Sequence, residues 1–137
     1  MSRALAVLVL SACVGGAFAE PARDVSGGWR GETSPDQVAP PYFAASLIQR
    51  GQRLSGAGYS NRCPACRGFD QFDVTWSGSV KGDIVLLIAR HPGRPWESEQ
   101  HYEGVLSADG QRITGTYRDG RNIERFVMER APNGVVQ

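Results

Sequence analysis

The 137-residue chain has almost no lysine, few cysteines, and no long apolar run beyond its N-terminal segment. Lys81 is its one lysine, and 15 basic residues stand against 14 acidic ones. Because the charge is balanced, nucleic acid is not an evident partner. No later apolar segment approaches the roughly 20 residues that a membrane-spanning helix needs. Outside the N-terminal segment no stretch repeats apolar residues at helical spacing, and no motif fixes a reaction.

The first 19 residues have the composition of a secretory signal. Arg3 precedes an apolar run over 4–10, and small residues ending at Ala19 are typical of a cleavage site. We therefore expect a signal peptide over 1–19 and a periplasmic or secreted protein. The alternative is lipid attachment at Cys13, which would anchor the same domain to a membrane, although only about seven apolar residues precede this cysteine.

Cleavage would leave Cys63 and Cys66 as the two cysteines of the mature chain. Because an exported chain meets an oxidising compartment, a disulfide between them is the expected state. A redox role is one alternative, but no helix follows whose N-terminus could lower a thiol pKa. Metal binding is another, with His91 as the plausible third ligand, but a structural zinc site needs four. We expect neither a metal nor another cofactor.

Short β-rich runs separated by glycine-bearing turns make up the rest of the chain. Glycines inside strands permit the coiling of a small closed barrel, and closure removes exposed sheet edges. We predict one all-β domain over 20–131, a single antiparallel up-and-down barrel of about eight strands, with a flexible tail over 132–137. An outer-membrane barrel is disfavoured because the strands are too short and too charged. The expected strands span 28–33, 43–49, 53–59, 69–80, 83–90, 97–106, 112–118 and 122–130.

The strand expected over 83–90 is apolar without interruption from Ile84 to Ile88. Such a strand usually has both faces covered, whereas a plain barrel leaves one face in water. Either the N-terminal segment or a second subunit would supply the cover. We favour a partner, including a homo-oligomer formed through this strand.

Gly27, Gly28 and Trp29 form a Gly-x-Trp motif in the first expected strand, and arginines lie near the end of the last one. Together with the meander of glycine-turn hairpins, these features resemble the calycin group of barrels, which includes lipocalins and avidin-like proteins. The resemblance implies that Trp29 packs at the closed end of the barrel under a basic side chain, either Arg125 or Arg130. The biotin-contacting pattern of avidins is not recognisable after Trp29, so the resemblance does not imply biotin.

The long connections fall on alternate turns. Because successive connections of an up-and-down barrel alternate between its ends, the loops 34–42, 60–68 and 91–96 should share one rim. Loops on a rigid scaffold and barrel mouths are common binding positions. Arginines on this rim would present forked donors to a carboxylate or phosphate, beside aromatic rings. The expected ligand-binding residues are Tyr42, Arg62, Arg67, His91, Arg94 and Trp96.

These patterns favour an exported binding protein whose rim takes an anionic or amphipathic small ligand. The alternative is a protein-interaction module of the cell envelope, an inhibitor or assembly factor, that offers the same loops to another exported protein. Inward residues such as Tyr102 and Phe126 could fill a barrel of this size, which would favour the interaction module. An enzyme is not expected, because no nucleophile can be placed beside His101, which lies between two glutamates at strand spacing.

Overall fold

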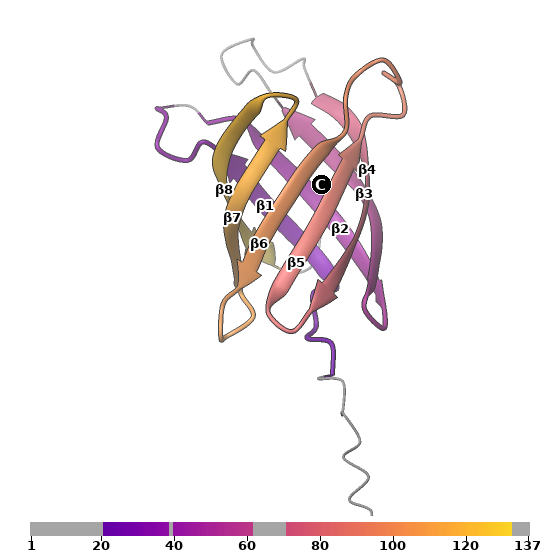
Figure 1. Ribbon diagram of the computed structural model, residues 1–137, viewed down its shortest axis with the longest axis vertical. Coiled ribbons are helices and arrows are strands. Elements are labelled where there is room, and N and C mark those ends of the chain that lie inside the picture. The colour runs from indigo at the N-terminus through magenta and orange to yellow at the C-terminus, as the bar shows by residue number, and fades with distance from the viewer. Residues whose placement is uncertain (1–20, 39, 62–70, 133–137) are drawn as a thin grey trace, which may run out of the picture.

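The computed structural model describes residues 21–38, 40–61 and 71–132, which form one closed β-barrel (Figure 1). Eight antiparallel strands follow one another around the wall in chain order, and β1 pairs with β8 to close the ring. The predicted all-β, up-and-down barrel is confirmed. No helix in the described ranges has the length and apolar character needed to cross a membrane. The strands are β1 (Gly27–Thr33), β2 (Tyr42–Arg50), β3 (Arg53–Asn61), β4 (Gln71–Lys81), β5 (Ile84–Arg90), β6 (Gln100–Leu106), β7 (Arg112–Asp119) and β8 (Asn122–Arg130).

The start of β6 differs most from the sequence-based expectation. β6 begins at Gln100 rather than at residue 97, because the β5–β6 loop continues as two successive turns. Arg94 N donates to His91 O at 2.9 Å, and Glu97 N donates to Arg94 O at 3.0 Å. The expected signal peptide and most of the expected tail lie outside the described residues.

Three short turns lie at one end of the barrel, and the described long connections lie at the other together with the short β7–β8 turn (Figure 1). The closed end carries the β2–β3, β4–β5 and β6–β7 turns. Gly51, Gly82 and Gly110 adopt positive φ values of 61°, 54° and 72° in these turns, a region that favours glycine. The opposite, open end carries the β1–β2 and β5–β6 loops and the β7–β8 turn. This arrangement gathers the described long loops at one rim, as predicted.

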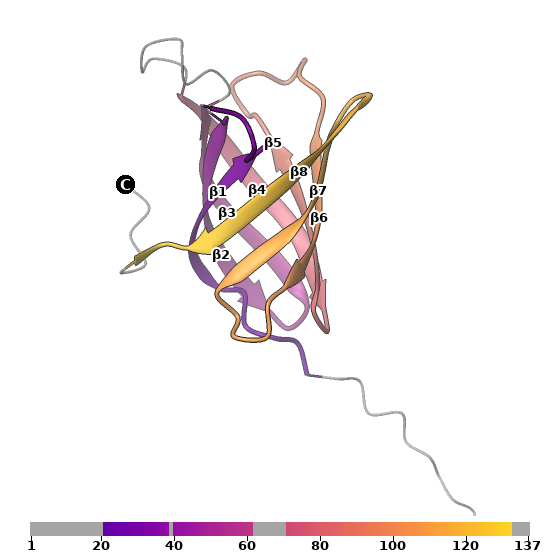
Figure 2. The ribbon, with the colours of Figure 1, turned by 90° about the vertical axis from the view of Figure 1, so that its left-hand side faces the viewer.

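The closed end is sealed by residues 22–26, which lead into β1 from below (Figure 2). Val25 and Trp29 are fully buried, and Trp29 Nε1 donates to Val25 O at 2.9 Å. The guanidinium of Arg130 lies over the Trp29 ring, 4.5 Å from its centroid. The basic side chain that covers Trp29 is therefore Arg130. Arg125 lies instead on the outer wall.

Aromatic side chains fill the interior of the barrel. Tyr102, which is 4% exposed, lies at the centre of this core. Its ring centroid is 4.9 to 5.3 Å from those of four other rings, Phe43, Trp76, Tyr117 and Phe126. Eight-stranded barrels are just wide enough for side chains to fill them, and this one is filled.

Among the described residues, the strand β5 is covered on its inner face only. Val85 and Leu87 are buried in the core, whereas the outward side chains of Ile84 and Leu86 are each 43% exposed. The sequence left two sources of cover for the outer face of β5, the N-terminal segment and a second subunit. The described N-terminal residues 21–26 lie across the closed end and not over this face, so they do not cover it.

Candidate functional site

The β5–β6 loop holds two of the predicted rim residues, His91 and Arg94, in one cluster. The His91 side chain is 1% exposed, and its Nε2 lies 3.3 Å from Gln100 Oε1 and 3.9 Å from the Glu97 carboxylate. Arg94 donates to Glu97 at 3.1 Å and lies over the Phe72 ring at 3.8 Å. Phe72 also meets the His91 ring edge-on. Both predicted residues therefore hold the loop in place, and Arg94 is already paired with a carboxylate.

Of the other four predicted rim residues, Trp96 and Tyr42 lie in the described part of the chain. Trp96 projects from the same loop and is 78% exposed. Tyr42 begins β2, where its hydroxyl accepts a hydrogen bond from Asn61 Nδ2 at 3.0 Å and its ring meets Tyr59 edge-on at 6.4 Å. The remaining predicted residues lie outside the described part of the chain: Arg62, Arg67 and the expected disulfide pair Cys63 and Cys66.

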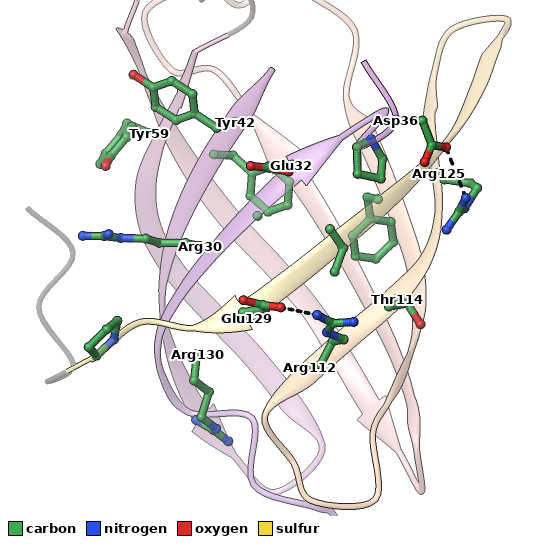
Figure 3. Close-up of a pocket in the computed structure, with 16 residues that line it drawn as sticks. Arg30, Glu32, Asp36, Tyr42, Tyr59, Arg112, Thr114, Arg125, Glu129 and Arg130 are labelled. Carbon is green, nitrogen blue, oxygen red and sulfur yellow. Dashed lines mark hydrogen bonds and ion pairs between the residues drawn. The ribbon is translucent and has the colours of Figure 1, made fainter. Parts of the chain in front are cut away.

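A groove of about 900 Å³ runs down the outer wall from the open end (Figure 3). The strands β1 and β8 form its floor, and β2, β3, β7 and the β1–β2 loop contribute its sides. Its outward-facing lining residues are Arg30, Glu32, Pro35, Asp36, Tyr42, Tyr59, Arg112, Thr114, Arg125, Val127, Glu129 and Pro132. Of the predicted rim residues, Tyr42 lines this groove.

Charges of both signs lie along the groove. Arg112 pairs with Glu129, and Arg125 pairs with Asp36 at 3.2 Å. These two ion pairs occupy the β7–β8 side. On the β1 side, Arg30 has no ion pair with any residue between 21 and 132 that the structure describes. The groove therefore offers at least one guanidinium that is not already matched by a carboxylate within 4 Å.

Apolar surface lies beside these charges at the upper end of the groove. Tyr42 and Tyr59 project from neighbouring strands and contact each other (Figure 3). Between them and Arg30, the outward side chain of Ala44 is only 1% exposed, because its cross-strand neighbours cover it. The groove is therefore amphipathic, with aromatic faces beside ionic groups.

Sequence reasoning missed most of this groove. Because side chains alternate along a strand, the sequence of β1 places Arg30 and Glu32 on the face opposite Trp29. That alternation could have identified them as an outward-facing pair. The approach of Arg112 and Glu129 to β1 depends on the pairing of β1 with β8, which joins the two ends of the domain. The predicted closed barrel implies that pairing, but no local pattern in the sequence gives its register, which sets Glu129 beside Arg30.

His101 lies apart from both the rim cluster and the groove. Its Nε2 is 3.6 Å from Glu99, which also accepts a hydrogen bond from Arg90 at 2.7 Å, and its side chain is 54% exposed. This is a solvated charge cluster on the outer wall. Within the described residues, no group of three or more His, Cys, Asp or Glu side chains could hold a metal ion.

No protein-family model, curated protein or solved structure matches this chain. The closed eight-stranded antiparallel barrel, with Trp29 under Arg130 at its closed end, is compatible with a calycin-like fold.

Proposed function

We propose that this protein is an exported interaction module that binds an extended segment of another envelope protein along the groove on its outer wall. The observation that carries the proposal is the filled interior. Because Tyr102 contacts four other rings at the barrel centre, a ligand would bind to the outside of the barrel. On the described part of the outer wall, the groove combines a hollow with charge and aromatic surface.

The shape of the groove supports an extended partner. Arg30 and Glu32 stand two residues apart on the same face of β1, and an extended peptide repeats its own side chains with the same period. A peptide with an acidic and a basic residue at alternate positions could pair with both. Both edges of β1 are already hydrogen-bonded, to β2 and β8, so recognition would use side chains rather than addition of a strand.

A second candidate function is the binding of a small anionic or amphipathic ligand at the same place. The unpaired guanidinium of Arg30 beside the Tyr42–Tyr59 pair favours it, since arginine presents a fork of donors to a carboxylate or phosphate. The experiment must therefore separate a protein partner from a small molecule.

Site-specific photocrosslinking provides the test. The full chain is expressed with its own leader in a Gram-negative host, and a photoreactive phenylalanine analogue replaces Tyr59 in the groove or, as a control, Ile48. Ile48 is exposed on β2 near the closed end and does not line the groove. We expect a discrete protein adduct from position 59 and none from position 48.

A charge variant then ties the adduct to the groove. The double variant Arg30→Ser with Glu32→Ser should abolish the adduct. Because both side chains are exposed, their loss should leave the fold intact. Equal adducts from positions 48 and 59 would contradict the proposal. The second candidate would be supported instead if no protein adduct forms and the purified wild-type protein carries the added mass of a small molecule that the Arg30→Ser variant lacks.

A further inference from the structure

The outer face of β5 and β6 carries an apolar strip, which we call the β5 face and define as Ile84, Leu86, Ile88 and Val105. Ile84 and Val105 are direct cross-strand neighbours, and both are exposed, as is Leu86. Ile88 is half-buried. By contrast, the exposed side chains of Ile48 and Ile123 come from two other strands, β2 and β8. The β5 face is thus a contiguous apolar surface on a wall that is otherwise mostly polar, and such patches mark association sites.

Opposite charges flank the β5 face at one level. The register places Leu86 between Ser79 on β4 and Glu103 on β6, and it places Arg53 of β3 beyond Ser79. A positive group therefore lies on one side of Leu86 and a negative group on the other. Neither Arg53 nor Glu103 makes an ion pair with any residue in the described ranges.

The two sides of the face also differ in height. On β4 the outward residues beside Leu86 and Ile88 are the small Ser79 and Ser77, whereas on β6 they are the longer Glu103 and His101. Beside Leu86 the face is low at Ser79, on the side that carries the positive charge, and high at Glu103, on the side that carries the negative charge. Beside Ile88 the Arg90 guanidinium covers Ser77, to which it donates at 3.1 Å. A surface with these properties is complementary to a rotated copy of itself.

We propose that the β5 face is the interface of a homodimer whose two-fold axis runs alongside β5 near Leu86. Such an axis lays β4 of each copy over β6 of the other, which seats Glu103 of each copy on Ser79 of the other. It also brings Arg53 of each copy to Glu103 of the other, so the interface forms that ion pair twice. Two-fold interfaces are self-complementary in this way, and packed sheets cross at about 30°.

This inference does not depend on the proposed function. The barrel order places β5 four strands from β1 in either direction, so the β5 face and the groove lie on opposite walls. Dimerisation would leave both grooves accessible. The two proposals can therefore fail separately, because one predicts a mass of two copies and the other predicts a heterologous adduct.

The first test measures the mass of the full chain by sedimentation velocity over a dilution series. We expect a dimer that dissociates on dilution. Leu86→Glu should yield a monomer, because it places a charge at the centre of the apolar contact. Ile48→Glu, which puts the same charge on an exposed isoleucine outside the face, should leave the dimer unchanged. A wild-type monomer at all concentrations, or a dimer that Leu86→Glu does not weaken, would overturn the proposal.

The second test uses charge reversal. Glu103→Arg and Arg53→Glu should each weaken self-association at least about tenfold, because like charges then meet twice across the interface. A mixture of the two variants should restore association as a heterodimer, since every ion pair is then re-formed between the unlike copies. Restored association also demonstrates that both variants are folded. A mixture that stays monomeric would refute the two-fold arrangement.

Discussion

Replacing Tyr102 with alanine should remove the centre of the barrel core. The side chain is 4% exposed and contacts four other rings at centroid distances of 4.9 to 5.3 Å. Removing a buried large aromatic side chain typically lowers the free energy of unfolding by about 3 to 5 kcal/mol. Each aromatic pair adds about 0.5 to 1.5 kcal/mol beyond its buried area, so we expect Tyr102→Ala to reach the upper end of that range. That is a large share of the roughly 5 to 15 kcal/mol by which domains are stable.

Two measurements test this prediction. Urea denaturation gives the loss of stability, and Trp96→Ala is the matched control. Trp96 is 78% exposed, so its removal should change the free energy of unfolding by no more than about 0.5 kcal/mol. Binding of a benzene-sized ligand reports the new cavity, because apolar cavities of that kind stay dry and take up such ligands. The variant should bind the ligand and the wild type should not. Internal binding by the wild type, or a loss for Tyr102→Ala under about 1 kcal/mol, would refute the filled interior.

Two further predictions concern the closed end. Arg130→Met removes three hydrogen bonds to the carbonyls of Gly110, Ser26 and Asp24 and the contact over Trp29, so urea denaturation should show a loss of about 2 to 4 kcal/mol. Arg130→Lys should recover little of it, because an ammonium lacks the planar fork, and a full recovery would contradict this. Hydrogen bonds from Ser26, and to a lesser extent the charge of Arg130, hold the pKa of Asp24 below its usual 3.8. The stabilisation that the ionised Asp24 carboxylate gives is therefore complete above pH 3.8 and is lost as the pH falls through its lower folded pKa. Asp24→Asn should then flatten the loss of stability on acidification. An unchanged pH profile of stability in this variant would contradict the prediction.

The fold was predictable because its signals are local. Period-two counting along the strand expected over 97–106 places Tyr102, Gly104 and Leu106 on one face, and all three are buried. Glycines at the tight turns marked where the chain reverses, and the alternation of long and short connections assigned loops to ends. Each of these signals lies within a few residues, so it survives without knowledge of tertiary contacts.

The site was less predictable because it depends on contacts between distant residues and on loop conformation. Arg94 was expected to offer its guanidinium to a ligand, yet it pairs with Glu97 three residues later and stacks on Phe72 from β4. The same succession of turns displaced the start of β6. When a loop folds into successive turns, its charged side chains can pair with one another. Composition alone does not distinguish such a loop from one whose charged side chains remain available to a ligand.

The close packing that fills the barrel also depends on glycines within its wall. A Cβ atom at Gly58 would lie 1.9 Å from the carbonyl oxygen of Ala44, and one at Gly78 would lie equally close to that of Leu86. Side chains larger than hydrogen at these positions would push neighbouring strands apart, so the glycines keep the wall tightly coiled and the lumen narrow. Among the described residues, five aromatic rings fill this narrow lumen at the level of Tyr102. Both proposals therefore place recognition on outward residues, along the walls of β1 and β5, which the barrel holds on opposite sides.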